Sequence, residues 1–180
     1  MGFLEDIVET TRARVARKRE KRPLDELMAR LDPPPRGRPF SEALIAPGVS
    51  LIAEMKRASP SKGPIRPDAS VTEIVQMYEA AGASACSILT EPKFFGGRLA
   101  DLREAREACS LPLLRKDFII DRYQLVEARL AGADAALLIV AATGDKLLRT
   151  LLAFGHEIGL DLLVEIHDED DAEIAVAAGA

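Results

Sequence analysis

Apolar residues gather in five short runs that recur along the chain from Gly48 onward. Each run is four to seven residues long and rich in Ile, Leu, Val and Ala, and a segment with helical periodicity follows each one. Strand followed by helix, five times over, predicts a parallel sheet covered by helices. The predicted strands are residues 51–55, 83–89, 111–114, 135–140 and 162–166. The predicted helices are residues 71–81, 99–108, 123–131, 146–158 and 170–178.

The chain before this alternating body reads differently. Its first apolar residues share one stripe of a helix: Phe3, Leu4, Ile7, Val8 and Val15. Pro23 is suited to start a second short helix that ends before a polyproline link at residues 33–35. A further turn is predicted at residues 40–45, capped by Ser41. We therefore predict an N-terminal helical extension, residues 1–47, followed by a βα body, residues 48–180.

A short motif recurs at the ends of three predicted helices. The segments 79–83, 127–133 and 176–180 each combine Ala with a Gly just past the helix, where a left-handed cap is needed. A strand follows the first two at once. The third stands at the end of the printed sequence, where a sixth strand is expected.

Five βα units fit either a complete doubly wound sheet or the first five units of a (β/α)8 barrel. Charged residues separate the two: Glu54, Lys56, Lys116 and Glu165 lie at carboxyl ends of predicted strands, on the same face as apolar neighbours. In a doubly wound sheet both faces meet helices, and these charges would be poorly buried. In a barrel they point toward the mouth where active sites form. We therefore favour the barrel.

Two acids and two lysines at one barrel mouth form a nearly neutral set. Each group can perturb the pKa of its neighbours, as acid–base catalysis requires. Taken singly, each is also explained as an exposed strand-end residue in an ordinary salt bridge. Their matching positions favour a shared site.

Two loops add polar and aromatic groups beside these strand ends. Residues 57–64 read RASPSKGP and offer hydroxyls, charge and free N–H groups to an anion, although the composition also fits a plain turn. Residues 93–97 read KFFGG, and the aromatic pair either covers an aromatic ligand or packs on the rim.

Composition excludes several classes of function. The 180 residues carry 24 basic and 29 acidic side chains, a net charge of −5, with 4% aromatics and no Trp. Neither general nucleic-acid binding nor a stacking surface for single strands is expected. No apolar run approaches the length of a membrane span, and the N-terminus has no signal-peptide pattern.

The two cysteines, Cys86 and Cys109, belong to no CxxC or Cys/His cluster, which argues against a structural zinc site or a disulfide framework. We interpret both as small buried hydrophobic residues in a reducing compartment, and we expect a cytoplasmic protein.

Residues 1–38 hold ten basic and seven acidic side chains, net +3, so the remainder carries −5 − 3 = −8. We interpret this basic cluster as a solvated helix face. A docking surface for an anionic partner and a basic cluster beside an anionic ligand site are the alternatives.

Five segments together resemble one family, indole-3-glycerol phosphate synthase. They are IAEMKRASPSKG at 52–63, LTEPKFFGG at 89–97, LLRKDFIID at 113–121, LLIV at 137–140 and LVEIHDE at 163–169. The match runs from the N-terminal helices to residue 180, in order and with fitting spacing. The resemblance implies a (β/α)8 barrel with extra N-terminal helices over its mouth, of which this sequence contains the first five βα units.

The resemblance also implies a reaction: ring closure of 1-(2-carboxyphenylamino)-1-deoxyribulose 5-phosphate, with loss of carbon dioxide and water, without metal or organic cofactor. Lys116 corresponds to the general acid at the ribulose carbonyl, and Glu165 to the acid–base partner in dehydration. Lys56 corresponds to a lysine that contacts the substrate, and Glu54 to the glutamate that orients these groups. Substrate-lining positions correspond to Ser59, Ser61, Phe95, Phe118 and Leu137.

Members of this family carry three further βα units, whose loops hold the substrate phosphate. The printed sequence has none of these, so we expect the 180 residues alone to be weakly active or inactive and to associate through exposed sheet edges. Three hypotheses follow: the synthase itself, a catalytically incompetent half-barrel that folds or associates, and a complete doubly wound protein with another ligand. The charged strand ends argue against the third.

Overall fold

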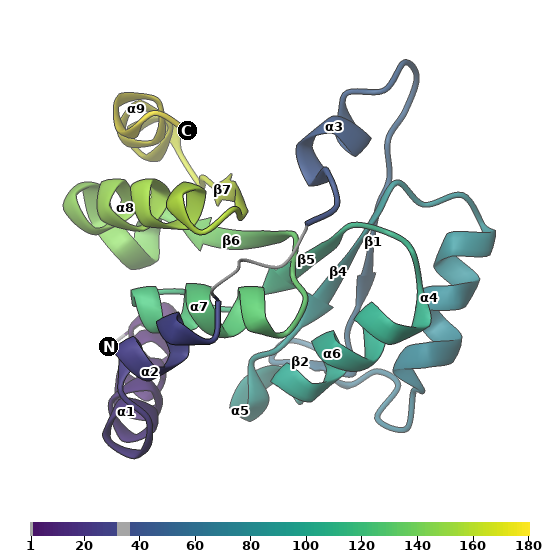
Figure 1. Ribbon diagram of the computed structural model, residues 1–180, viewed down its shortest axis with the longest axis horizontal. Coiled ribbons are helices and arrows are strands. Elements are labelled where there is room, and N and C mark those ends of the chain that lie inside the picture. Colours follow the sequence, from purple (N-terminus) through teal and green to yellow (C-terminus); the bar gives the residue numbers. More distant parts are fainter. Residues whose placement is uncertain (1, 32–36) are drawn as a thin grey trace. The chain divides into compact units, whose positions relative to one another are not determined.

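The computed structural model describes residues 2–31 and 37–180 (Figure 1). Five strands form one parallel sheet whose order follows the chain, β1-β4-β5-β6-β7, which confirms the predicted α/β fold. The strands are β1 (Ile52–Met55), β4 (Ala85–Leu89), β5 (Leu113–Lys116), β6 (Ala135–Ile139) and β7 (Asp161–Glu165). The predicted polyproline link at residues 33–35 lies outside the described residues.

Contacts divide the chain into two compact units. The first, called here the β1 unit, comprises residues 36–117 and 131–135. The second, called the α1 unit, comprises residues 1–35, 118–130 and 136–180.

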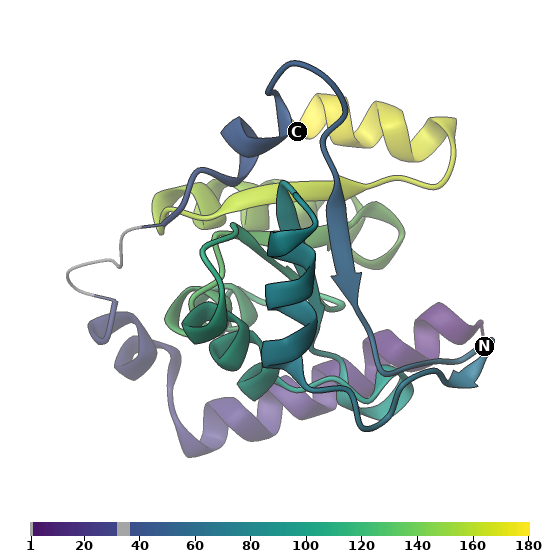
Figure 2. The ribbon, with the colours of Figure 1, turned by 90° about the vertical axis from the view of Figure 1, so that its right-hand side faces the viewer.

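In the β1 unit, β1 pairs in parallel with β4, and β4 with β5. Strand β4 is buried along its whole length. Helix α4 (Val71–Ala80) packs beside β1, as Figure 2 shows, and also against α6 (Leu99–Ala108). The short helix α3 (Phe40–Leu44) buries Phe40, and the predicted Ser41 cap is wrong because the helix begins before Ser41, with Pro39 at the cap position. The core of the unit is thus the apolar interior of these strands and helices, as the hydrophobic pattern predicts.

The two loops predicted in this unit contain short elements that the sequence pattern does not predict. After β1 the chain forms a small antiparallel hairpin, β2 (Ala58–Ser59) with β3 (Gly63–Pro64). After β4 comes the one-turn helix α5 (Pro92–Phe95). Glu91 caps α5, because its carboxylate accepts hydrogen bonds from the backbone N–H groups of residues 93, 94 and 95 at 3.1, 2.6 and 3.2 Å.

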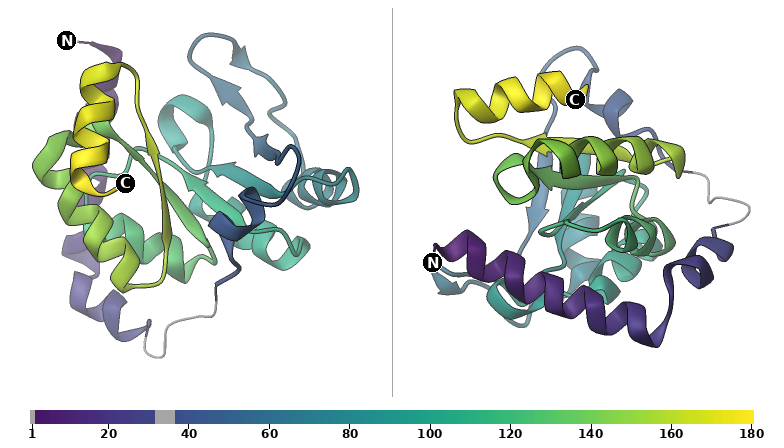
Figure 3. Two further views of the ribbon diagram at one scale, coloured as in Figure 1. Left: turned by 90° about the horizontal axis from the view of Figure 1, so that it is seen from above. Right: turned by 90° about the vertical axis from the view of Figure 1, so that its left-hand side faces the viewer.

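The α1 unit contains α1 (Phe3–Lys21), α2 (Leu24–Ala29), α7 (Arg122–Leu130), α8 (Val140–Glu157) and α9 (Glu169–Ala178). Both views in Figure 3 show α9 packed along α8. Helical backbone begins at residue 140, earlier than the predicted start at 146. Gly144, with φ 64° and ψ 175°, breaks this stretch into a first turn and a longer helix.

The glycines that follow three predicted helices adopt the left-handed conformation expected of them. Their φ values are 83° at Gly82, 91° at Gly132 and 88° at Gly179. The prediction of left-handed caps is therefore confirmed.

The basic face of α1 meets acidic residues of the same unit. The Lys18 ammonium lies 2.7 Å from Glu127, and the Arg19 guanidinium lies 2.9 Å from Asp121. Tyr123 also donates a hydrogen bond to the Lys18 carbonyl at 3.4 Å. Some of the excess positive charge thus serves to fasten α1 to α7 and the segment before it.

Both cysteines are free and buried, which confirms the interpretation of them as small core residues. Burial, with a further contribution from Cys109, raises the pKa of the Cys86 thiol to about 12. A thiol with so high a pKa is a poor nucleophile at neutral pH. Among the described residues, no helix is both long and apolar enough to cross a membrane.

Candidate active site

Three of the four predicted acid–base residues meet in the β1 unit. Glu54 lies in β1, Lys56 follows that strand directly, and Lys116 is the last residue of β5. The Glu54 carboxylate bridges the two ammonium groups, with one oxygen 2.6 Å from Lys56 Nζ and the other 3.1 Å from Lys116 Nζ. These contacts confirm that the three side chains share one face of the sheet, as strand parity predicts.

The strand register explains why these side chains meet. Glu54 is aligned with Ser87 of β4, and Lys116 with Leu89, two residues further toward the carboxyl end. Lys56 and Lys116 therefore both lie two residues beyond Glu54 toward the carboxyl ends of the strands, and the Glu54 carboxylate lies between their ammonium groups. The Tyr78 hydroxyl of α4 donates a hydrogen bond of 2.9 Å to the Glu54 carbonyl and fixes the strand below.

Glu54 is held as a carboxylate between partly exposed lysines. Its side chain is 27% exposed, against 33% for Lys56 and 37% for Lys116, so the ammonium groups remain accessible to a ligand. Burial alone would raise the pKa of Glu54. The hydrogen bond from Lys56 and the charge of Lys116 outweigh this effect, and the pKa falls below its ordinary value of 4.5.

This lowered pKa predicts a specific loss of stability in acid. A carboxyl group whose pKa is lower in the folded than in the unfolded state stabilises the fold above its ordinary pKa, and this contribution disappears as the pH falls through the folded-state value. Urea unfolding should therefore show Glu54→Gln to be less stable than the wild type at about pH 6, with a deficit that shrinks as the pH is lowered below the ordinary value of 4.5. The exposed Glu173→Gln serves as the control. A Glu54→Gln deficit that stays constant across this range would contradict the assignment.

The other face of β5 carries a charge that the sequence analysis did not consider. Arg115 is only 2% exposed, and its guanidinium lies 2.8 Å from Asp117 and 3.1 Å from the Thr90 hydroxyl. Thr90 in turn donates to Asp117 at 2.9 Å. This closed network rigidifies the chain on both sides of Lys116.

The predicted substrate-lining residues of the β1 unit lie on the two loops beside the ion-paired cluster. Ser59 is in β2 and Ser61 in the turn that follows, with their hydroxyls 3.5 Å apart. Phe95 is the last residue of α5 and is partly exposed.

The remaining predicted site residues belong to the α1 unit. Glu165 is the last residue of β7, and its side chain is exposed. Phe118 is partly exposed, and Leu137 in β6 is 3% exposed. That these three join Glu54, Lys56 and Lys116 in one site stays a prediction.

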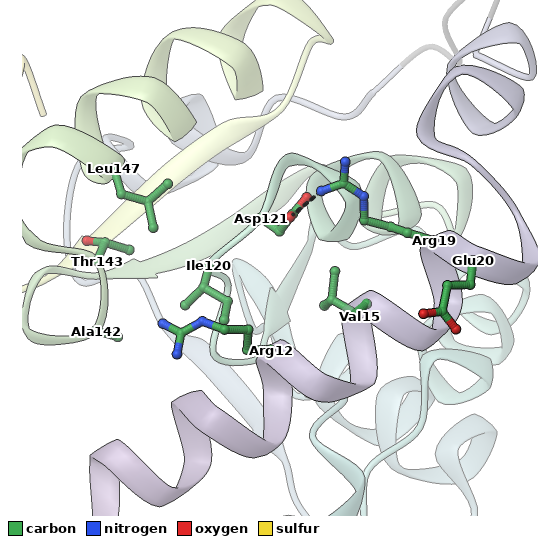
Figure 4. A pocket seen from close by; sticks show the side chains of 10 residues that line it. Arg12, Val15, Arg19, Glu20, Ile120, Asp121, Ala142, Thr143 and Leu147 are labelled. Atoms are coloured by element: carbon green, nitrogen blue, oxygen red, sulfur yellow. Dashed lines mark hydrogen bonds and ion pairs between the residues drawn. The ribbon is translucent and has the colours of Figure 1, made fainter.

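The α1 unit has a cavity of about 750 Å³ beside the basic face of α1 (Figure 4). Val15, Ile120 and Leu147 supply apolar wall. Its charged lining residues are two arginines and two carboxylates: Arg12, Arg19, Glu20 and Asp121. Because these formal charges cancel, the cavity offers an anion little net attraction, and a solvated, locally paired face remains the simpler interpretation of the basic cluster.

Sequence reasoning missed two buried acids that shape the loops of the site. Glu91 caps α5, and its position just before a proline was an available signal. Asp101 is fully buried and binds Arg57 of the first loop as well as Arg98. Nothing in the local sequence pairs Asp101 with Arg57, because 44 residues separate them.

A parallel α/β sheet with a carboxylate held between two lysines at its strand ends is an arrangement suited to acid–base chemistry. Comparison with known proteins defines the family. The family model for indole-3-glycerol phosphate synthase matches residues 4–180, and the chain belongs to that family.

Similar proteins include several that bear this name. The indole-3-glycerol phosphate synthase of Streptomyces griseus is 47% identical over 180 residues, which cover all of this chain and 67% of the relative. That of a Nocardioides species is 49% identical, covering all of this chain and 69% of the relative. That of Desulfosudis oleivorans is 46% identical, covering 99% and 69%.

Proposed function

We propose that this chain performs the acid–base chemistry of indole-3-glycerol phosphate synthase, acting as a carboxy-lyase in tryptophan biosynthesis. The substrate would be 1-(2-carboxyphenylamino)-1-deoxyribulose 5-phosphate, a phosphorylated small molecule, and the reaction would close the indole ring with loss of carbon dioxide and water. The observation that carries the proposal is the Glu54 carboxylate bridging Lys56 and Lys116 in a chain of this family.

Each charged residue has a role that its position supports. Lys116 protonates the ribulose carbonyl oxygen as the aromatic carbon attacks, which prevents an alkoxide from building up. Carbon dioxide then leaves, and Glu165 serves as the acid–base partner while the hydroxyl departs as water. Lys56 contacts the substrate and assists the acid chemistry. Glu54 orients both ammonium groups.

The lining residues divide between the two ends of the substrate. The hydroxyls of Ser59 and Ser61 face the polar, anionic part. The aromatic ring would contact the apolar side chains Phe95, Phe118 and Leu137. No metal or organic cofactor enters this scheme, because proton donors and acceptors suffice for decarboxylation and dehydration.

The proposal includes the architecture and setting predicted from the sequence. Residues 1–47 would be a helical extension over the mouth of a barrel, and residues 48–180 its first five βα units. We further propose a cytoplasmic protein that binds neither nucleic acid nor membranes.

A second candidate is a half-barrel without catalytic competence that associates with itself or with a complementary chain. One observation favours it: β1 lies at one end of the strand order, and the residues before it expose large apolar side chains. Val49 is 99% exposed, Ile45 80% and Leu51 58%. An unpaired edge flanked by apolar surface is prone to pairing with other chains.

Turnover and mass in solution separate the two candidates. We expect the 180-residue polypeptide alone to form indole product slowly or not at all, because about a third of each similar protein lies outside the matched region and we ascribe phosphate binding to that part. Binding energy from a remote group positions the reacting carbons, so its loss lowers kcat as well as affinity.

The assay follows indole fluorescence with the polypeptide alone and after mixing with the remaining C-terminal third of the Streptomyces griseus relative. Mixing should restore turnover and reduce self-association. Product formed only in the mixed sample supports the synthase, whereas no product in any sample, together with stable association, supports the second candidate. Near-normal turnover by a monomer would show that the further chain contributes little.

A further inference from the structure

Asp101, in the first turn of α6, is a fully buried carboxylate of the β1 unit that binds Arg57 of the loop after β1. It has no exposed surface. One oxygen accepts from Arg98 Nε and Nη2 at 3.1 and 2.7 Å. The other accepts from the Arg98 backbone N–H at 2.9 Å and from Arg57 Nη1 at 2.6 Å. A buried carboxylate with four donors from two residues is held rigidly and holds its partners in turn.

Arg57 links this carboxylate to the loop after β1. Its side chain is 13% exposed, and its guanidinium also donates to the Ala69 carbonyl at 3.3 Å. Its own carbonyl accepts from the backbone N–H groups of Ile65 and Arg66 at 2.8 and 3.1 Å, which closes the segment 57–66 at its base. Asp101 thus anchors the side chain of Arg57 to α6, while the backbone carbonyl of Arg57 closes the loop.

The space around Arg57 would allow other positions. A cavity of about 440 Å³ is lined by Arg57, Gly96 and Arg98 together with residues 67–69. A guanidinium released from Asp101 has room to move there, and rotamer freedom would favour such movement. The ion pair with Asp101, together with the weaker hydrogen bond to the Ala69 carbonyl, therefore selects the observed position.

We infer that Asp101 is a positioning residue for the reaction and acts through Arg57. Arg57 directly follows Lys56, and the segment it closes carries Ser59 and Ser61, so the carboxylate fixes the residues that present a cation and two hydroxyls to the substrate. This role rests on the proposed function. If Asp101 has this role, replacing it should disturb the loop and turnover more than the free energy of unfolding, whereas replacing a purely structural ion pair should mainly lower that free energy.

Hydrogen exchange tests the holding step without any need for activity. In Asp101→Asn, which keeps the side-chain size, amides of segment 57–66 should lose protection by about tenfold or more, while β4 and β5 keep theirs. Asp134→Asn is the matched control, since Asp134 is an equally buried carboxylate that binds Arg106 and backbone N–H groups but does not touch this loop. Unchanged exchange in segment 57–66 of Asp101→Asn would overturn the inference.

Turnover tests the positioning step in the mixed sample described above. We expect kcat/KM to fall about 10- to 100-fold in Asp101→Asn, because small misplacements of a catalytic group have effects of that size. Arg57→Lys keeps the charge but loses the planar fork, and it should cause a similar loss. The double variant should be no worse than either single one. Arg57→Lys also replaces Asp101→Asn as the test if the latter fails to fold.

The outcomes separate this inference from the proposed function. A loosened loop with unchanged kcat/KM would overturn the positioning role while leaving the proposed function intact. Absence of turnover in the mixed wild-type sample would refute the proposed function, and the positioning role with it. Hydrogen exchange would then still show whether Asp101 holds the segment.

Discussion

Lys116→Met is expected to lower kcat about 10²- to 10⁴-fold, the usual contribution of a positioned general acid. Methionine keeps much of the side-chain length and apolar stem but cannot donate a proton. Lys116 is 37% exposed, so its loss should leave the fold stable and remove chemistry specifically. Glu54 would keep its contact with Lys56, which preserves the rest of the cluster. The rate of indole formation in the mixed sample measures the effect.

Lys146→Met is the matched control for this variant. Lys146 is an exposed lysine in α8, outside the proposed site, and its replacement should leave turnover within about twofold. Equal activity of the two variants would show that Lys116 is not the general acid.

Asp134→Ala is expected to cost about 3–5 kcal/mol of unfolding free energy, as for a buried ion pair that loses one partner. Asp134 is 3% exposed and accepts hydrogen bonds from the backbone N–H groups of Arg38 at 2.7 Å and Leu113 at 2.8 Å. Its second oxygen also lies 2.9 Å from Arg106 Nη1. Alanine would leave three donors without this partner, one of them the partly buried guanidinium of Arg106. Urea unfolding should show a lower midpoint with an unchanged slope.

Asp145→Ala provides the comparison for Asp134→Ala. Asp145 pairs with Arg149 at 2.7 Å, but both side chains are about half exposed, so this pair should contribute no more than about 1 kcal/mol. Similar losses from the two substitutions would mean that the Asp134 contacts contribute little to stability.

The strands and most helices could be predicted because burial imposes simple periodicities. The apolar runs match strands that lie against helices, and the alternation of faces is enough to predict that Glu54, Lys56 and Lys116 lie together. Gly82, Gly132 and Gly179 were predictable as caps because only the left-handed conformation ends a helix in that way. These features depend on near neighbours in the sequence.

Features that depend on distant partners escaped prediction. Arg115 shows that a charged residue in a strand does not always lie on the accessible face of the sheet. It is buried on the other face, where Asp117 and Thr90 bind its guanidinium. Asp101 pairs with Arg57, 44 residues away, and no local pattern announces such a pair. The hairpin β2–β3 could not be predicted, because strands of two residues are too short to show an alternation of apolar and polar residues.

We propose that one site contains all four acid–base residues. The rate of indole formation by Glu165→Gln in the mixed sample tests this proposal most directly. Glu165 belongs to the α1 unit, whereas the other three residues belong to the β1 unit. Its place in the site is supported by the alternation of strand faces and not by an observed contact, so it is the residue to test. We expect kcat to fall about 10²-fold or more. We also expect the double variant Glu165→Gln/Lys116→Met to lose much less than the product of the two single losses, as for residues that act as a unit. A Glu165→Gln rate within about twofold of the wild type would show that Glu165 does not act with the other three residues.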